Sequence, residues 1–215
     1  MEVTSGIRSI LSNANAYDFV QNALGAAHYR AEIARTYVRQ GSRNPLRILD
    51  VGCGTARIFQ YLRGCTYVGL DHSALYIEAA TRRYGESATF VQTDAASASF
   101  ERWQGQFDCV LMLGLLHHLD DHECVSLLRS AGGALAPGGR LLAVDPTVAP
   151  HTPAVARFLV SRDRGRNVRA PEGYEALGRR AFSESHVHLR HDLLRVPYTH
   201  AILECSHGRS SQDGE

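Results

Sequence analysis

Hydrophobic and polar residues follow two periods along the chain, one typical of strands and one of helices. Short apolar runs lie near residues 47–52, 67–72, 89–94, 107–114 and 140–146. Runs of this length, bounded by glycine or polar residues, are typical of buried strands. The stretches between them are long enough for crossover helices, so the five strands are predicted to be parallel and covered on both faces. The pattern predicts a doubly wound α/β domain.

Both ends of the chain add to this sheet. Residues 187–196 and 199–206 have strand character, and too few residues separate them for a crossover, so they are predicted to form an antiparallel hairpin. Apolar or small residues recur at helical spacing over residues 14–40 and stop at Gly41, which predicts a helical segment. We expect residues 1–41 to form a helical cap over the cleft.

Composition and charge narrow the class of protein. With 215 residues, 44% of them hydrophobic, the chain is expected to form a single domain over residues 1–215. The net charge of +1 gives no basic surface for nucleic acid and no membrane anchor. The longest apolar run, Cys109 to Leu116, is too short to span a bilayer. Five cysteines without a Cys-x-x-Cys pair favour free thiols and a cytoplasmic location.

A glycine-rich turn after the first strand carries the candidate chemistry. Asp50 precedes the turn glycines Gly52 and Gly54, and the second strand ends at Asp71. This arrangement holds a nucleoside-bearing cofactor in an open α/β sheet. The third glycine of the dinucleotide fingerprint is absent, which weakens the case for NAD. Asp50 suits a cationic ligand such as S-adenosylmethionine (SAM), and Asp71 can accept hydrogen bonds from both ribose hydroxyls.

The chain resembles the class I, Rossmann-like SAM-dependent methyltransferases, and among them the small-molecule enzymes of bacterial type. The resemblance runs from about Tyr17 to Cys205. Its motifs stand in family order at residues 49–55, 69–71, 92–95, 107–110, 117–119 and 135–141. It implies a seven-stranded, mostly parallel sheet with a C-terminal antiparallel hairpin, SAM as cofactor and S-adenosylhomocysteine as product.

The resemblance also implies which residues hold the cofactor. They are Tyr17, Arg30, Asp50, Gly52, Cys53, Gly54, Asp71, His72, Asp94, Ala95, Leu113 and His118. Asp94 is expected to bind the adenine amino group, with helix capping as the alternative. Arg30 is a hypothesis for the SAM carboxylate, against an ordinary charge on a surface helix. Cys53 is interpreted as a small residue tolerated between two glycines rather than as a reactive thiol.

Histidines near the fourth strand allow two interpretations. His118 and His122 are four residues apart with Asp121 beside them, which superficially suggests metal ligands. No motif places a third and fourth ligand, so no metal site is predicted. The resemblance instead places His118 near the methyl end of the cleft. It is expected either to act as the catalytic general base or to pack on the cofactor.

Substrate recognition is expected outside the shared motifs. Residues 146–186 are longer than an ordinary crossover and are predicted to form a lid. Gln21, Arg164 and Tyr174 are the predicted substrate-binding residues. The alternative for the arginine-rich part of this stretch is a solvated loop in which arginines pair with neighbouring acidic residues.

These observations predict transfer of the sulfonium methyl group to a small molecule by in-line displacement. The acceptor atom stays open among oxygen, nitrogen and carbon. A nucleic-acid acceptor is disfavoured because residues 113–116 lack an Asn/Asp-Pro-Pro-aromatic motif. No membrane partner is expected, and the protein is expected to be a monomer or a homodimer. The alternatives are another SAM reaction, such as intramolecular cyclisation, and a non-catalytic SAM-binding module.

Overall fold

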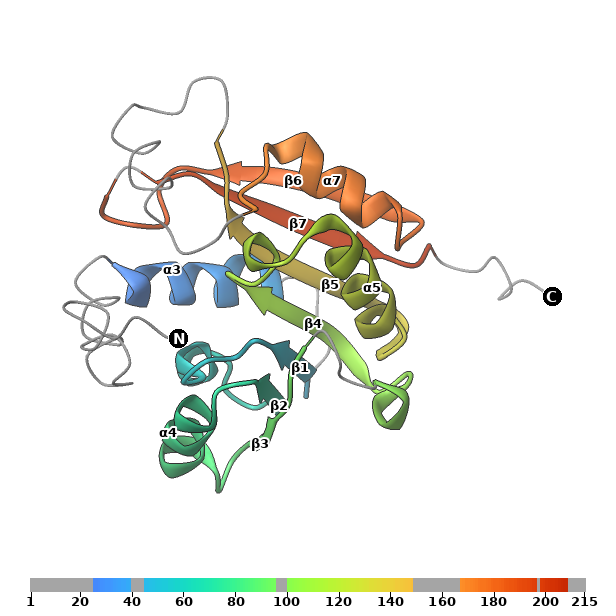
Figure 1. Cartoon of the computed structure of the whole chain (residues 1–215). Helices are drawn as coiled ribbons and strands as arrows, with labels where there is room; N and C mark the ends of the chain where they lie inside the picture. Colours follow the sequence, from blue (N-terminus) through green and yellow to red (C-terminus); the bar gives the residue numbers. More distant parts are fainter. Residues whose placement is uncertain (1–24, 40–44, 96–99, 149–166, 197, 209–215) are drawn as a thin grey trace, which may run out of the picture.

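A seven-stranded sheet forms the centre of the molecule, with strand order β3-β2-β1-β4-β5-β7-β6 (Figure 1). The computed structural model describes residues 25–39, 45–95, 100–148, 167–196 and 198–208. Strands β1 to β5 are parallel, and β7 is antiparallel to both β5 and β6. The strands are β1 (Arg47–Val51), β2 (Thr66–Asp71), β3 (Thr89–Gln92), β4 (Phe107–Leu113), β5 (Leu135–Pro146), β6 (Glu184–Arg190) and β7 (His200–Ser206). The predicted fold class is confirmed.

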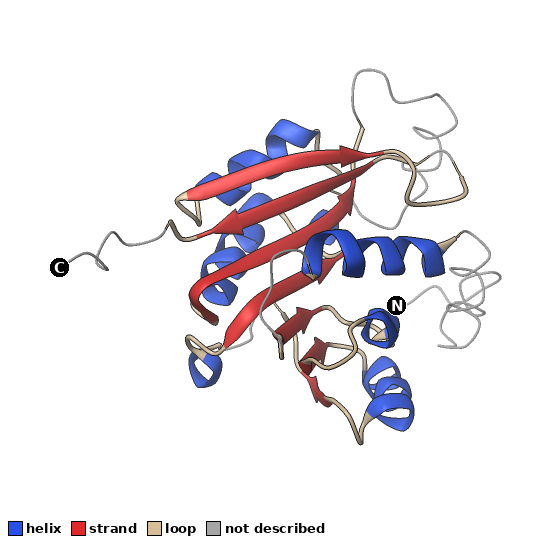
Figure 2. Ribbon diagram, turned by 180° about the vertical axis from the view of Figure 1, so that it is seen from behind, coloured by secondary structure: helices blue, strands red, loops and turns tan. Residues whose placement is uncertain are grey.

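Helices cover both faces of this sheet. They are α3 (Ala26–Glu32), its π-helical continuation η1 (Ile33–Val38), α4 (Ala74–Tyr84), α5 (Asp121–Gly132), α7 (Pro171–Arg179) and the 3₁₀ turns η2 (Arg57–Tyr61), η3 (Glu101–Trp103) and η4 (Leu116–His118). Helices α5 and α7 lie on one face, and α3 crosses the other (Figures 1 and 2). Among the described residues, none of these helices has the length and apolar character needed to cross a membrane.

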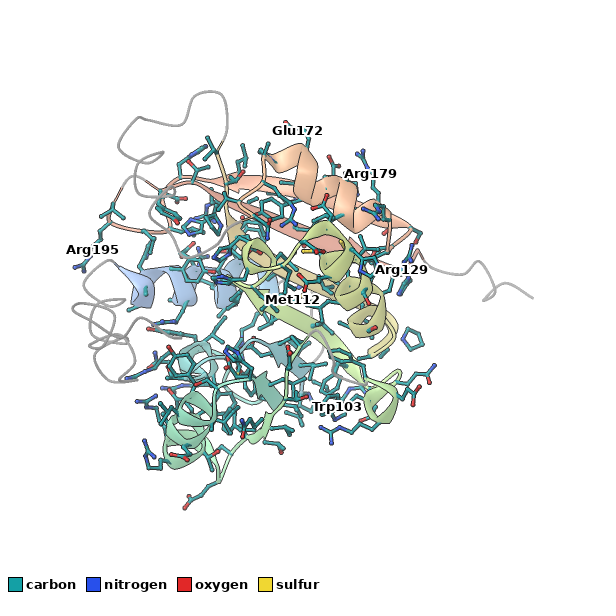
Figure 3. The ribbon with its side chains drawn as sticks, viewed as in Figure 1. Trp103, Met112, Arg129, Glu172, Arg179 and Arg195 are labelled. Atoms are coloured by element: carbon teal, nitrogen blue, oxygen red, sulfur yellow. The ribbon has the colours of Figure 1, made fainter. Side chains whose placement is uncertain are left out.

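The core consists of two apolar layers, one on each side of the sheet. Met112 of β4 is fully buried in the layer under α5, whereas Glu172 and Arg179 of α7 are exposed at the surface (Figure 3). The layer under α3 contains Ile33 from its continuation and Ile48 from β1. Neighbouring residues of one strand enter opposite layers, which explains why the central strands are apolar throughout.

Two predicted strands have different limits in the structure. The fifth begins at Leu135 rather than at residue 140, because residues 136–139 remain in the strand where its register against β4 shifts between Phe107 and Cys109. The sixth strand occupies Glu184–Arg190 rather than residues 187–196. The last residue of this strand, Arg190, is paired with His200 of β7. Beyond it the chain leaves the sheet, and Asp192 Oδ1 lies 2.7 Å from Arg190 Nε.

The N-terminal helix is part of the core where the structure describes it. Ile33, Ala34 and Val38 are buried against the sheet, so the helix over residues 26–38 packs into the core. Residues 1–24, which complete the predicted cap, lie outside the described residues.

The lid prediction is wrong for residues 171–186. These residues form α7 and the beginning of β6, and Tyr174, Leu177 and Gly178 of α7 are buried against the sheet. The apolar face of α7 accounts for this position, since a helix with one apolar side gains stability by covering it. Residues 149–166 of the same stretch lie outside the described residues.

Close packing of α7 on the C-terminal hairpin leads to a test. A Cβ atom at Gly178 would overlap the Ser185 hydroxyl and lie 2.8 Å from the Cys205 sulfur. We expect Gly178→Ala to lower the free energy of unfolding by about 1–3 kcal/mol, because overpacking forces the hairpin away from the helix. Denaturant unfolding monitored by circular dichroism measures this. Glu172→Ala, on the exposed side of the same helix, is the control, and equal stabilities would contradict the packing.

Candidate active site

The glycine-rich turn is fixed to the carboxyl end of β2. The backbone N–H groups of Gly52 and Cys53 both donate to the Leu70 carbonyl at 2.8 Å. Gly52 and Gly54 have φ angles of 76° and 54°, which favour glycine over residues with a side chain. A Cβ on Gly54 would meet no atom within 4 Å, so open space lies in front of the backbone there. A ligand can therefore approach the main chain of this turn.

Asp71 is held rigidly beside the turn. One carboxylate oxygen accepts from the Gly54 N–H at 2.9 Å and the other from the Ser73 N–H at 2.8 Å. The residue is 7% exposed. Each carboxylate oxygen has a second lone pair, so Asp71 can accept two further hydrogen bonds from a ligand. The two vicinal hydroxyls of a ribose can donate these two hydrogen bonds.

Asp50 is the most buried acidic group of the cofactor-binding turn. Its Oδ2 accepts from the Tyr67 hydroxyl, and its Oδ1 has no hydrogen-bond partner among the described residues. Burial above all, with a smaller contribution from the nearby negative charge of Asp71, raises the pKa of Asp50 to about 7. A buried carboxylate oxygen without a donor is costly unless a ligand supplies one. An ammonium group fits this position.

The ends of β3 and β4 complete the surroundings of the turn. The Thr93 N–H donates to the Asp71 carbonyl at 2.9 Å, so the end of β3 lies beside Asp71. The next two residues are the exposed Asp94 and the half-buried Ala95. Leu113 ends β4, and the Leu115 side chain lies 3.3 Å from the place that a Cβ on Gly52 would take. The loop after β4 therefore faces the turn.

The other predicted site residues lie beside the cluster, on α3 or outside the described residues. His72 is exposed, with its Nδ1 3.5 Å from Asp71 Oδ1. Arg30 is half-buried on α3, which packs beside η2. Tyr17, Gln21 and Arg164 lie outside the described residues.

Tyr174 is a correction to the predicted substrate site. Its side chain is 0% exposed, and its hydroxyl donates to the Pro146 carbonyl at 2.9 Å. Burial raises the pKa of this phenol well above its usual value. An aromatic residue on the apolar side of a helix packs into the core, and Tyr174 is not retained as a substrate-binding residue.

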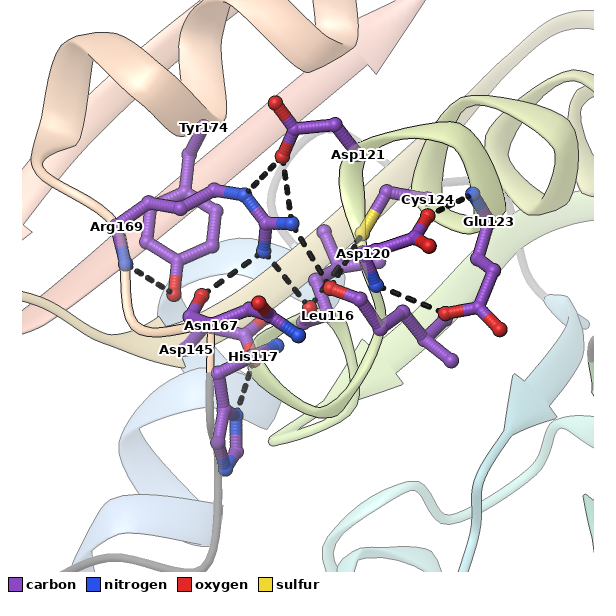
Figure 4. A network of polar contacts seen from close by, with 11 residues as sticks. Leu116, His117, Asp120, Asp121, Glu123, Cys124, Asp145, Asn167, Arg169 and Tyr174 are labelled. Atoms are coloured by element: carbon purple, nitrogen blue, oxygen red, sulfur yellow. Dashed lines mark hydrogen bonds and ion pairs between the residues drawn. The ribbon is translucent and has the colours of Figure 1, made fainter.

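A second polar cluster lies at the ends of β4 and β5, and it contains residues that the sequence analysis did not select. His117 Nδ1 lies 2.6 Å from Asp145 Oδ1, and the His117 backbone N–H donates to the same oxygen at 3.0 Å (Figure 4). Both residues are buried, at 4% and 1% exposure. Asp145 Oδ2 has no partner among the described residues. His118 is exposed, with its ring centroid 4.0 Å from that of His117.

A signal for this pair exists in the sequence. Asp145 lies near the end of the fifth predicted strand, and His117 follows the end of the fourth. The carboxyl ends of parallel neighbouring strands meet at one edge of a sheet, so the two residues are candidates to meet there. The pair of adjacent histidines does not itself indicate which ring is turned inward.

Cysteines and metal ligands show no reactive arrangement in the part of the chain that the structure describes. All five cysteines are free thiols, and burial raises the pKa of Cys53 well above its usual value. This supports the interpretation of Cys53 as a small residue in the turn. No three His, Cys, Asp or Glu side chains of the described residues are placed to hold a metal ion.

Comparisons with known proteins agree with the geometry. Residues 48–139 match a family model described as a methyltransferase domain. The chain is 33% identical over 95 residues to a ubiquinone biosynthesis O-methyltransferase from Chelativorans sp., covering 40% of this chain and 38% of that protein. It is 31% identical over 110 residues to a ribosomal RNA small subunit methyltransferase C from Chromohalobacter salexigens, covering 49% and 33%. The chain thus spans well under half the length of each of these relatives.

A solved structure shows the same fold. It is described as a putative O-methyltransferase from Nostoc punctiforme, and it aligns with a TM-score of 0.70 at 19% identity, covering 95% of this chain and 62% of that one. Together the comparisons confirm the predicted family resemblance and SAM as the cofactor.

Removal of the Asp71 charge tests the ribose contact. We expect Asp71→Asn to weaken SAM binding about 10-fold to 100-fold, since a hydrogen bond to a charged group contributes about 1.5–3 kcal/mol. Isothermal titration with SAM measures the loss. Glu78→Gln, on exposed α4, is the control and should bind as the unchanged protein does. An unaltered dissociation constant in Asp71→Asn would contradict the assignment.

The pKa of Asp50 gives a pH dependence with a defined sign. Below about pH 7 the free protein carries a protonated Asp50, so a cationic ligand must displace a proton, and SAM affinity should rise as the pH increases toward 7. Titrations at about pH 5.5 and about pH 7.5, in buffers of different ionisation enthalpy, measure affinity and proton release. We expect Asp50→Asn to release no proton. Proton release of equal size in both proteins would rule out Asp50 as its source.

Proposed function

We propose that this chain, a member of the class I SAM-dependent methyltransferases, methylates a hydroxyl oxygen of a small molecule. The observation that carries the proposal is the buried His117–Asp145 pair. Both residues lie at the same edge of the sheet as Asp50 and Asp71, Asp145 on β5 and His117 on η4, just after Leu115, which faces the glycine-rich turn. A base next to a methyl donor is the combination that O-methylation requires.

The cofactor end of the site binds and orients. When bound, SAM supplies a methyl group on a positively charged sulfur, which a nucleophile attacks from the opposite side. Asp71 holds the ribose, Asp50 faces the ammonium group, and the open backbone at Gly54 lets the cofactor approach the turn. Alignment of this kind contributes about 7–11 kcal/mol to catalysis in well-oriented reactions.

The His117–Asp145 pair handles the proton. A neutral hydroxyl is a weak nucleophile, and imidazole is the usual general base near neutral pH. Asp145 accepts the hydrogen bond of Nδ1–H, which leaves Nε2 as the basic nitrogen. As the oxygen–carbon bond forms and the sulfur–carbon bond breaks, the hydroxyl proton passes to Nε2. The Asp145 charge then stabilises the resulting imidazolium.

This assignment changes the role expected for His118. The His118 side chain is exposed, whereas the His117 ring is buried against the Asp145 carboxylate. We therefore assign the base to His117 and keep His118 as a cofactor contact. A buried base suits a hydroxyl acceptor, because the hydroxyl must lose its proton as it is methylated.

Two observations support a small acceptor. The net charge of the chain is +1, and a nucleic-acid partner would favour a basic surface. The Chelativorans relative carries an O-methyltransferase name that refers to ubiquinone biosynthesis. The predicted cytoplasmic location and the choice between monomer and homodimer stay predictions.

The test uses a panel of phenols, catechols and hydroxyquinones with isotopically labelled SAM. The protein should produce S-adenosylhomocysteine and an O-methylated acceptor in equal amounts. Cyclisation of SAM would yield no S-adenosylhomocysteine, and a non-catalytic module would yield no product. Transfer of the labelled methyl group to ribosomal RNA, offered in place of the panel, would identify a nucleic-acid acceptor and contradict the proposal.

Substitution of the base separates catalysis from binding. His117→Gln should lower kcat about 100-fold to 10,000-fold, because a general base accelerates a reaction by about this factor. The affinity for SAM should stay unchanged. Asp145→Asn should lower kcat through loss of the oriented tautomer. His118→Gln is the matched control, with an effect on SAM affinity only. A larger loss of kcat in His118→Gln than in His117→Gln would overturn the assignment.

A further inference from the structure

We infer that Arg169 is a positioning residue that holds His117 against Asp145. This inference rests on the proposed function for the role of the pair, but the geometry can be measured without any acceptor. Arg169 lies in the segment before α7, and its side chain is 11% exposed. Figure 4 shows its guanidinium next to the turn that carries His117, between that turn and Asp121.

The guanidinium of Arg169 binds the two ends of the histidine turn. Its Nη1 donates to the Leu116 carbonyl at 2.9 Å, and its Nη2 donates to the Leu119 carbonyl at 2.8 Å. These carbonyls lie immediately before and two residues after His117. The turn is therefore held from both sides by one planar group.

The backbone around Arg169 extends the same attachment to Asp145. The Asn167 N–H donates to the His117 carbonyl at 3.0 Å. The Arg169 carbonyl accepts from the Thr147 hydroxyl at 2.8 Å, two residues beyond Asp145. Residues 167–169 therefore contact both the turn with the histidine and the strand end with the carboxylate. Their relative position fixes the 2.6 Å contact within the pair.

Arginine suits this role better than lysine. Its donors form a rigid planar fork, which can serve several carbonyls at fixed angles, whereas lysine offers a single flexible ammonium group. Nε also donates to Asp121 Oδ1 at 2.8 Å. The Asp121 side chain is 67% exposed, so water screens this ion pair, and the contacts to Leu116 and Leu119 carry the positioning.

Loss of the guanidinium would release the histidine turn. The Leu116 and Leu119 carbonyls would lose their two shortest side-chain donors and keep the longer contacts from the Cys124 thiol, so the turn would be held less firmly relative to β5. A displacement of about 1 Å in a catalytic group lowers the rate by about 100-fold. Arg169 itself touches neither His117 nor Asp145 through its side chain in the described contacts, so it acts through the turn.

Nuclear magnetic resonance of ¹⁵N-histidine-labelled protein tests the inference directly. The Nδ1 proton of His117, hydrogen-bonded to a buried carboxylate, should give a downfield resonance that disappears in His117→Gln. We expect Arg169→Ala to abolish or strongly shift this resonance in a protein that still unfolds cooperatively. An unchanged resonance in folded Arg169→Ala would overturn the inference, whether or not an acceptor is ever methylated.

Two further variants keep the test decisive. Arg129→Ala is the matched control. The exposed Arg129, in the last turn of α5 (Figure 3), also donates to a backbone carbonyl, that of Arg180 at 2.9 Å, but it has no contact with the turn that carries His117 among the described hydrogen bonds. It should leave the resonance unchanged. If Arg169→Ala fails to fold, Arg169→Lys decides, with a shifted resonance expected and an unchanged one contradicting the inference. With an acceptor in hand, Arg169→Lys should lower kcat about tenfold or more, with KM for SAM unchanged.

Discussion

The parallel pairing of β2, β1, β4 and β5 determines where the polar groups of this protein lie. Asp50 is opposite Leu111, and the end of β4 is opposite Val144, so the carboxyl ends of four strands lie along one edge. The hydrogen bonds of the sheet and the apolar side chains on its two faces fix these registers. Asp50, Asp71, His117 and Asp145 therefore converge because each lies near or just beyond the end of a strand, and at this edge His117 and Asp145 contact each other.

This edge contains groups that are costly to bury. Asp50 and Asp145 each have one oxygen bonded and one oxygen without a partner among the described residues. A folded chain tolerates such oxygens where the surrounding contacts determine the structure. Here the Tyr67 hydroxyl donates to the Asp50 carboxylate, and the backbone N–H and ring of His117 contact the Asp145 carboxylate. The oxygens without a partner reduce stability at the edge of the sheet where we propose that binding and chemistry take place.

Much of the fold and half of the site could be predicted from the sequence. Strand spacing and the glycine-rich turn depend on local patterns, and these patterns point to Asp50, Gly54 and Asp71. The burial of His117 depends instead on a 3₁₀ turn packed against β5, and adjacent residues give no local sign of which ring turns inward. The sequence predicts that Tyr174 binds substrate, but it lies on the side of α7 that packs on the C-terminal hairpin. That packing is also a tertiary contact, which the local sequence does not indicate.

The buried carboxylates along this edge have a consequence for the balance of charge in the reaction. In the proposed reaction, Asp50 and Asp71 face the cationic cofactor, and Asp145 faces the proposed base, His117. Methylation of a hydroxyl would remove the positive charge from sulfur and create one on His117. The positive charge would then move from one set of buried carboxylates to another, and the total charge at this edge of the sheet would stay constant. Such a turnover needs no counterion from solvent until the proton leaves His117.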